Sequence, residues 1–475
     1  MFVVIAQGTS AGAQLDYFLQ MLMTPAGLGA LAAFIVALVA VTVAPKLKWF
    51  VLAGLLYAGS LGFPGELLFR VPFVAPLQAL RANGRGLSAA CLALLLVPAL
   101  FTHAAGWRRR LVLGGTAVFL VFQLVLCVRI LAAGLADRAA VSVPVYLLTF
   151  GVVAIGLSRW LHTMDDVRAA FRAVAGCAAL LLAGTLVQLA INRTAPLING
   201  RLFGTTSNPQ FLGSACALLL PPVLYLMLQR TEPKWWRLTL GAMAGFLVLF
   251  LAWTGSRTAA LMALVGLGLT FRLRLGRLLG AGIVCGIFVL VAVQLFGESS
   301  ESAERLLSLQ DTRSAVWMNM LGEFFAHPLA GVIEGRDIAV SENSYLAVAS
   351  RVGLLGLVPM MIALVLIGLA LFRLQRLRRY LGNDALAADV VTAGIVSLLV
   401  GSVFDGYLVG TISFQLFYFQ VALAIATFLL DYAEQSAWSA SAAAEQGHGF
   451  DVVMPEDAVG AGVGYGDGPV AHDGY

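Results

Sequence analysis

The chain has 475 residues, of which 60% are hydrophobic and only 12% are charged, and its mean hydropathy is +0.90. Soluble domains carry about 45–50% apolar and about 25% charged residues, so this composition excludes a soluble enzyme, a secreted disulfide scaffold and a disordered chain. The net charge of +5 is no sign of nucleic-acid binding, because positive charge in membrane proteins collects in cytoplasmic loops. The five cysteines lie in apolar runs without metal-ligand spacing, which predicts buried structural side chains.

Thirteen apolar runs are candidates for membrane-spanning helices, each of which needs about 20 mainly apolar residues. In chain order they cover 26–44, 47–63, 87–102, 111–133, 141–161, 170–191, 209–228, 238–253, 258–271, 278–296, 353–372, 386–404 and 411–430. We therefore expect an all-α, polytopic bundle of about 12–13 transmembrane helices, with one large loop over 297–352.

Basic residues predict the orientation of these helices, because they are enriched in short cytoplasmic loops. Six clusters in every second loop hold 18 of the 30 basic residues: Lys46 and Lys48; Arg108, Arg109 and Arg110; Arg159, Arg168 and Arg172; Arg230, Lys234 and Arg237; Arg272, Arg274 and Arg277; and Arg373, Arg376, Arg378 and Arg379. If these loops face the cytoplasm, the N-terminus and the 297–352 loop face the opposite side and the C-terminus faces the cytoplasm. The final segment, 431–475, is rich in Ala, Gly, Ser and acidic residues and is expected to be a disordered cytoplasmic tail.

Two segments on the non-cytoplasmic side carry polar residues close to the spans. Residues 199–209 read NGRLFGTTSNP and lead into the run at 209–228, and residues 254–258 read TGSRT between two apolar runs. Arg201 in the first segment fits a capped, solvated turn as well as a binding site. Arg257 in the second is costly if it faces lipid, so it is expected to point into the bundle or a wet cavity, unless it reaches the interface.

Two more such segments lie in and after the large loop. Arg313 and Trp317 are four residues apart and share a helix face, and they precede the sequence HPLAG that begins at His327. An amphipathic helix lying on the membrane is the alternative explanation for this segment. The fourth segment is SENSYL over 341–346, where Glu342 and Asn343 fit either a site or a helix cap.

Taken in order, the four segments resemble the superfamily of O-antigen ligases and Wzy-type O-antigen polymerases. Its members show R-x-x-G-T-x-x-N-P before a span, a Ser-Arg pair opening a later span, R-x-x-x-W with a Pro-Leu-x-Gly turn, and H-N-x-x-L followed by G-x-x-G. The corresponding residues here are Arg201 to Pro209, Ser256 and Arg257, Arg313 and Trp317 with Pro328 to Gly331, and Glu342 to Leu346 with Gly353 and Gly356. The resemblance covers about 199–372 and implies N-terminal transmembrane helices over 1–198 and a ligase- or polymerase-like core over 199–430.

The chain departs from the family pattern at Glu342, where the ligases carry a histidine that is their presumed base. Of the five histidines, only His327 lies on the predicted outer side. This departure favours polymerisation of exopolysaccharide or O-antigen repeat units over O-antigen transfer to lipid A-core, which remains an alternative.

The resemblance implies an inverting glycosyl transfer on the periplasmic face of the bacterial inner membrane, with a glycan on a polyprenyl diphosphate as donor. Arg201 and Arg257, with Arg313 third, are expected to bind the leaving diphosphate, because a guanidinium pairs with two phosphate oxygens. Glu342 is the expected base, with His327 in reserve and Asp405 a distant third. The further expected substrate contacts are Asn343, Trp317 and Tyr345.

No cofactor or metal is expected, because the predicted outer face has no D-x-D motif. The expected partners are the lipid-linked donor, a glycan or lipid-core acceptor, the bilayer and other polysaccharide-export proteins, and no nucleic acid. Two other classes remain open, a multi-span transporter with Arg129 on its path and a structural subunit of a secretion assembly.

Overall fold

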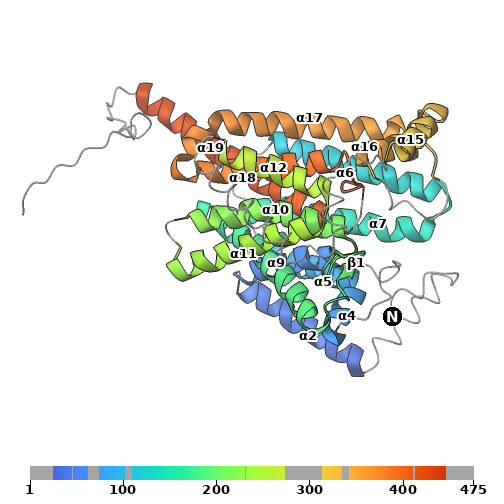
Figure 1. Ribbon diagram of the computed structural model, residues 1–475. Coiled ribbons are helices and arrows are strands. Elements are labelled where there is room, and N and C mark those ends of the chain that lie inside the picture. The colour runs from blue at the N-terminus through green and yellow to red at the C-terminus, as the bar shows by residue number, and fades with distance from the viewer. Residues whose placement is uncertain are drawn as a thin grey trace, which may run out of the picture.

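The computed structural model is a bundle of helices, most of which lie side by side along a common axis (Figure 1). It describes residues 25–44, 46–61, 74–101, 110–229, 232–272, 313–333, 342–409 and 412–445. Within these ranges the regular structure is helical except for one two-stranded hairpin. The all-α, polytopic architecture predicted from composition is therefore confirmed.

The elements follow the chain in this order: α2 (Pro25–Val43), α3 (Leu47–Ser60), α4 (Ala75–Ala82), α5 (Gly84–Phe101), α6 (Arg110–Ala132), α7 (Ala136–Thr149), η3 (Phe150–Gly156), α8 (Leu157–Trp160), α9 (Met164–Ile191), β1 (Leu197–Ile198), β2 (Arg201–Leu202), α10 (Pro209–Leu228), α11 (Lys234–Trp253), α12 (Arg257–Phe271), α15 (Ser314–Ala326), α16 (Ser344–Val352), α17 (Leu354–Leu377), η4 (Arg378–Asp384), α18 (Ala385–Gly401) and α19 (Phe414–Glu445).

Twelve of the thirteen predicted runs coincide with helices, and the run at 278–296 lies outside the described residues. Within the described ranges, seven helices are long and apolar enough to cross a membrane, if α17 and α18 are taken as the one stretch Leu354–Gly401. The bent pair α4–α5 makes an eighth, while α2, α3 and α12 are shorter apolar helices. The protein is thus a multi-pass membrane protein.

The apolar runs predict a span for α5 alone and do not predict the bent pair that it forms with α4. α4 and α5 meet at 67° across Asn83. The side-chain amide of Asn83 donates to the carbonyl of Ala79 at 2.8 Å, which binds Asn83 to the last turn of α4. At Gly84 a Cβ would lie 2.9 Å from that of Leu61, so glycine allows α5 to start against the end of α3.

The spans alternate in direction, which puts two different sets of residues at opposite ends of the bundle. α9, α11 and α18 each begin at a predicted basic loop, whereas α10, α12 and α17 each end at one. We call this end the basic end. The other end carries the hairpin, the start of α12, and α15 and α16, which lie at the right-hand end of α17 in Figure 1. We call it the motif end.

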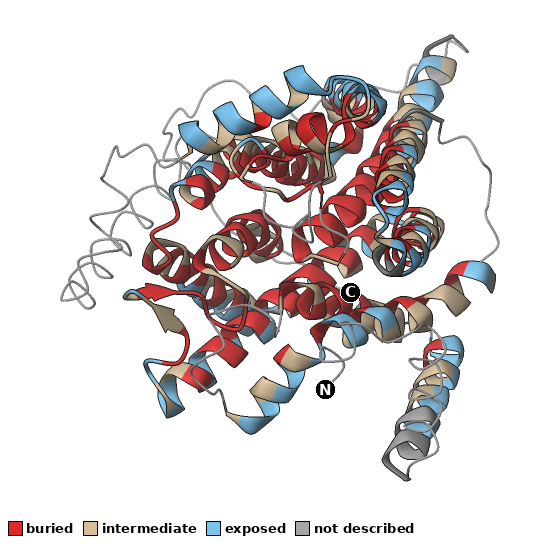
Figure 2. Cartoon of the chain, turned by 90° about the vertical axis from the view of Figure 1, so that its right-hand side faces the viewer, coloured by how far each residue is buried: buried red, intermediate tan, exposed pale blue. Residues whose placement is uncertain are grey.

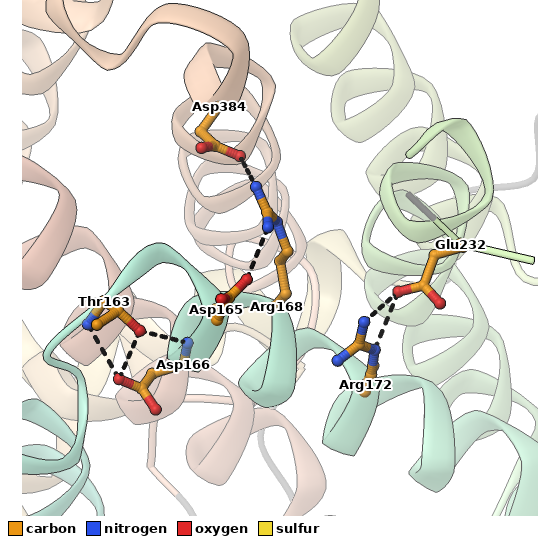
Figure 3. Close-up of polar contacts among 7 residues, drawn as sticks. All are labelled: Thr163, Asp165, Asp166, Arg168, Arg172, Glu232 and Asp384. Atoms are coloured by element: carbon orange, nitrogen blue, oxygen red, sulfur yellow. Dashed lines mark hydrogen bonds and ion pairs between the residues drawn. The ribbon is translucent and has the colours of Figure 1, made fainter. Parts of the chain in front are cut away.

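Ion pairs hold several basic loops together at the basic end (Figure 3). Arg168 in the first turns of α9 pairs with Asp165 at 2.7 Å and with Asp384 of η4 at 3.0 Å. Arg172, one turn further along α9, pairs with Glu232 in the α10–α11 connection. These contacts join the basic clusters that the sequence predicted to share one side.

The start of α9 is fixed by a capping box, also visible in Figure 3. The Thr163 hydroxyl accepts from the backbone N–H of Asp166 at 3.3 Å, and the Asp166 carboxylate accepts from the backbone N–H of Thr163 at 3.0 Å. Both bonds satisfy backbone donors that a helix start leaves without intrahelical partners.

Asp389 of α18 is a buried carboxylate at the basic end, and arginines from neighbouring elements surround it. Asp389 is 2% exposed and accepts from Nε of Arg378 with both oxygens at 2.9 Å. Arg272, at the end of α12, lies 3.6 Å away. The pairing allows a charged group to lie inside the bundle.

The centre of the bundle is formed by α10 and α19, the most buried of the spans. Figure 2 shows this distribution, with buried residues at the middle and exposed ones at the rim. Near the motif end the two helices are joined by a hydrogen bond from the Gln415 amide to the Ser214 hydroxyl at 2.8 Å. Both side chains are buried, so this contact fixes the register of α19 beside α10.

The prediction that a disordered tail begins at residue 431 is wrong for the first part of that segment. α19 continues as a helix to Glu445, well beyond the expected boundary at residue 430. Ala433 is fully buried, and Glu434 pairs with Arg373 of α17 at 2.7 Å, so packing and charge support this extension. Residues 446–475 lie outside the described ranges.

Candidate functional site

The first motif segment forms a tight hairpin at the motif end. β1 and β2 pair antiparallel, with Ile198 opposite Arg201, and the two residues between them are Asn199 and Gly200. Their φ angles are 48° and 69°, the left-handed values that a two-residue hairpin turn requires and that Asn-Gly adopts most readily. The turn therefore places Arg201 at a defined position beside the spans.

Arg201 joins this hairpin to the second motif segment. Its side chain is buried, and its Nε donates to the carbonyl of Thr254 at 2.7 Å. The Trp253 indole N–H donates to the carbonyl of Gly200 at 3.2 Å. The two segments are thus connected in both directions.

The start of α10 completes this junction. The Asn208 side chain accepts from the backbone N–H of Phe211 at 2.9 Å, as an N-cap does, and Pro209 occupies the first helical position. A Cβ on Gly213, one turn later, would lie 2.8 Å from that of Ala259 in α12. Glycine here allows the two helix starts to approach closely.

The third and fourth segments are joined mainly through their backbones. The turn at 328–331 lies against the α16–α17 junction, where N–H groups of Leu354 and Leu355 donate to the carbonyls of Pro328 and Leu329 at 2.8 and 3.1 Å. A Cβ on Gly353 would lie 2.5 Å from the carbonyl of Leu329, and one on Gly331 would lie 2.6 Å from that of Ser350. Both glycines also have positive φ, so no other residue fits easily.

Arg129 belongs to the same joint. It lies in the last turn of α6, and its guanidinium donates to the carbonyl of Gly331 at 3.1 Å. The intramembrane arginine that suggested a transport path therefore contacts the 328–331 turn at the motif end.

Arg313 connects three of the four segments at one point. Its guanidinium lies 3.8 Å from a carboxylate oxygen of Glu342 and 3.6 Å from one of Asp405. It also donates to the Thr258 hydroxyl at 3.3 Å, next to Arg257 at the start of α12. The Phe404 ring lies 5.6 Å from the guanidinium carbon and 6.2 Å from the Trp317 ring. We call Arg313, Glu342, Asp405 and Thr258 the Arg313 cluster.

Asp405 is the buried carboxylate of the Arg313 cluster. It lies between α18 and α19, and burial raises its pKa from 3.8 to about 6, although Arg313 and a hydrogen bond from Tyr407 act in the opposite direction. The Tyr407 hydroxyl donates to it at 2.9 Å. The Ser344 hydroxyl donates to the Asp405 carbonyl at 2.9 Å and fixes its backbone.

Glu342 is the accessible carboxylate of the same cluster. Its side chain is 39% exposed, against 9% for Asp405, so solvent reaches it more easily. One of its oxygens is buried and, apart from the ion pair, has no hydrogen-bond partner among the described residues. Glu342 does not cap the following helix, because Asn343 does so.

The other predicted site residues lie in different settings. Asn343 is buried and caps α16 by accepting from the N–H groups of Tyr345 and Leu346 at 2.9 and 3.0 Å. The Tyr345 hydroxyl donates to the carbonyl of Leu399 in α18 at 3.0 Å. Both side chains therefore have structural roles in this arrangement.

Trp317 and Arg257 border the Arg313 cluster. The indole N–H of Trp317 is buried and finds no acceptor within the described part of the chain. Arg257 is exposed at the first position of α12, where Ser256 caps the helix by accepting from the N–H of Ala259 at 3.3 Å. An anion beside Arg257 would also lie near the helix N-terminus, which favours negative charge.

His327 lies away from the Arg313 cluster. It is exposed and ends α15, whereas Arg313 precedes the first residue of that helix. At 1.5 Å per residue the two backbones are about 21 Å apart along the helix axis. The structure brings Arg313, Glu342 and Asp405 together and leaves His327 apart.

Sequence reasoning gave too little weight to Asp405 and missed Thr258, Phe404 and Arg81. An aspartate in the apolar connection between two predicted spans is the signal that could have raised Asp405 in rank. Arg81 is 1% exposed in α4, and it donates to the Thr206 carbonyl at 3.2 Å beneath the first motif segment. It lies in a helix that was not predicted.

No protein-family model matches the chain, and no curated protein matches it. Among the described residues there is no group of three or more His, Cys, Asp or Glu side chains placed to hold a metal ion.

Proposed function

We propose that the protein is a glycosyltransferase of the bacterial inner membrane that uses a polyprenyl-diphosphate-linked glycan as donor and polymerises exopolysaccharide or O-antigen repeat units. The motif end faces the periplasm in this proposal and the basic end faces the cytoplasm. One observation carries it. Four segments that resemble the O-antigen ligase and polymerase superfamily lie at one end of the bundle. Three of them meet at Arg313, and Arg201 joins the remaining one to the segment that contains Thr254 and Thr258.

The leaving diphosphate gains negative charge as its bond to the anomeric carbon breaks, and cationic groups stabilise it. Arg257 fits this role best, because it is exposed and lies at a helix N-terminus. Arg201 is buried against the Thr254 carbonyl and shapes the loop beside it. Arg313 faces two carboxylates, so it orients the acidic groups of the site.

The acceptor hydroxyl loses its proton to a carboxylate while its oxygen attacks the anomeric carbon. The electron pair of the bond to the donor passes to the diphosphate, and the anomeric configuration inverts. Glu342 is the proposed base, because it is the exposed carboxylate of the cluster and stands at the family's histidine position. Asp405 is the second candidate. Its pKa of about 6 lies close enough to neutral pH for the side chain both to accept and to release a proton.

The test is an assay with the purified protein in vesicles and a polyprenyl-diphosphate oligosaccharide. Lengthening of the glycan on the lipid supports polymerisation, whereas transfer to lipid A-core identifies a ligase. The proposal would be overturned by two results together: the purified protein transfers no glycan from the donor, and cells that lack the gene keep an unchanged polysaccharide profile.

Two carboxamide variants then identify the base. Glu342→Gln is expected to lower turnover about 10²–10⁴-fold, the usual contribution of a general base, without weakening donor binding. His327→Ala is the matched control and is expected to keep its activity, since His327 lies apart from the cluster. If Glu342→Gln is active and Asp405→Asn is not, Asp405 is the base.

A further inference from the structure

α15 presents three kinds of surface along its length. Its inner side packs toward the bundle through buried Met320 and half-buried Trp317. On its outer side Met318 and Phe325 are 65% and 74% exposed, and Leu329, just past the helix, is 70% exposed. Polar Asn319 and Glu323 are exposed beside this apolar stripe.

The spacing shows that the apolar stripe is a feature of the helix. Met318, Gly322 and Phe325 follow one another at four and three residues, which places them on one helix face. Asn319 and Glu323 are each one residue further on and form the adjacent face. The outer surface of α15 is thus divided lengthwise into an apolar and a polar stripe, the pattern of helices that lie in a membrane interface.

The apolar stripe continues into a surface that faces lipid. The Leu355 N–H donates to the Leu329 carbonyl at 3.1 Å, and this bond places the end of the stripe at the start of α17. Along α17, Leu355, Val358 and Ile362 are 56%, 49% and 48% exposed, and this helix belongs to a stretch that crosses the membrane. In Figure 1, α15 lies at the right-hand end of α17.

We infer that α15 lies in the plane of the membrane at the motif end and inserts Met318, Phe325 and Leu329 among the acyl chains of that leaflet. The lipid surface is favoured over a protein partner because the stripe is continuous with the lipid-facing side of α17. The polar stripe of Asn319 and Glu323 then faces water and headgroups. The inference does not depend on the proposed function.

Insertion of α15 also positions the Arg313 cluster relative to the membrane. Arg313 directly precedes α15, and Trp317 lies on its inner side, so insertion of the outer stripe sets the depth of both relative to the bilayer. The Arg313 cluster would lie close to the headgroup level, where the diphosphate of a membrane lipid is found.

The experiment uses the full chain in vesicles of phosphatidylethanolamine and phosphatidylglycerol. Met318→Cys and Phe325→Cys carry a spin label on the apolar stripe, and Asn319→Cys and Glu323→Cys are the matched variants on the polar stripe. Ile362→Cys on α17 gives the lipid reference and His327→Cys the water reference. The spectrum of the labelled parent chain is subtracted, since Cys91 is half-buried.

Labels at 318 and 325 are expected to be at least several-fold more accessible to dissolved oxygen, relative to a water-soluble nickel complex, than labels at 319 and 323. Equal ratios at the four positions would overturn the inference, because the whole helix would then lie in water. Protection of 318 and 325 from both reagents would overturn it as well, because a protein surface would then cover the stripe.

Discussion

Arg313 faces two carboxylates that differ in exposure, and this difference separates their chemistry. Glu342 is reached by solvent, whereas Asp405 is buried and holds a hydrogen bond from Tyr407. Burial disfavours the charged form of Asp405, and Arg313 offsets this only in part. The site therefore retains a proton on Asp405 to a higher pH than an isolated aspartate would.

This retained proton makes stability depend on pH. The pKa of Asp405 is raised from 3.8 to about 6, so the folded chain holds the proton more tightly than the unfolded chain does. The stabilisation that the folded chain gains from this protonated carboxyl is fully present below pH 4 and is lost as the pH rises through 6. Asp405→Asn, which cannot ionise, is expected to be more stable relative to the parent at pH 7 than at pH 4, by up to about 3 kcal/mol.

The check is thermal unfolding in detergent at both pH values, with Asp165→Asn as control because its carboxylate is 83% exposed. A difference between Asp405→Asn and the parent chain that does not change with pH would contradict the raised pKa.

The proposed roles of Arg313 and Arg257 differ, and kinetics can separate them. Arg313 makes contacts toward Glu342, Asp405 and Thr258, which one ammonium group cannot reproduce. Arg313→Lys is therefore expected to lower kcat with little change in the KM for donor. Arg257→Ala is expected to raise the KM and also to lower kcat, since the proposed role of Arg257 is to bind the leaving diphosphate. If Arg313→Lys raises the KM for donor at unchanged kcat, Arg313 binds donor and the roles are reversed.

At the scale of elements, apolar runs predicted the spans well because hydropathy and length decide whether a helix crosses a bilayer. The same reasoning missed α4, which is eight residues long and carries the buried Arg81. It also ended the last helix too early, because Ala-rich polar sequence forms helix once Ala433 and Glu434 find partners in the bundle. Tertiary contacts, which a single sequence does not display, decided both.

In the candidate site, too, some residues could be found from local sequence patterns, whereas others depend on tertiary contacts. Polar segments beside the spans pointed to Arg257, Arg313 and Glu342. In the structure Arg313 lies 3.8 Å from Glu342 and contacts Thr258, which follows Arg257. Asp405 is only the third candidate base in the sequence, because the partners that connect it to the site, Arg313 and Ser344, are 92 and 61 residues away in the chain. The capping role of Asn343 was one of two interpretations that its sequence context allowed.

The backbone joint between the 328–331 turn and the α16–α17 junction permits a sharp test. Gly331→Ala introduces a Cβ at positive φ and 2.6 Å from the Ser350 carbonyl, which we expect to cost more than about 2 kcal/mol. Gly322→Ala on α15 is the control, because its Cβ would meet nothing within 4 Å and alanine favours helix. Unfolding temperatures in detergent give the comparison, and equal values for both variants would disprove the geometry of the joint.

At the scale of the molecule, the two ends of the bundle differ in charge chemistry. The basic end carries arginines paired with Asp165, Glu232, Asp384 and Asp389. The motif end carries the Arg313 cluster. The alternation of the spans keeps these ends apart, and basic loops normally stay in the cytoplasm.

The proposed orientation rests on this rule and can be measured in intact cells. An impermeant maleimide is expected to label His327→Cys at the motif end and not Arg379→Cys at the basic end, since both side chains are exposed. Permeabilised cells provide the control in which both react. Labelling of Arg379→Cys alone in intact cells would reverse the orientation and remove the site from the periplasm.

The length of α19 has a practical consequence. Its 32 residues extend about 48 Å at 1.5 Å per residue, whereas the hydrocarbon core is about 30 Å thick. The ion pair between Arg373 and Glu434 ties the helix to α17 where the extra turns begin, and exposed Trp438 follows one turn later. An affinity tag or fluorescent domain fused after Glu445 would thus start about 18 Å from the hydrocarbon core, on a helical spacer that separates it from headgroups and detergent.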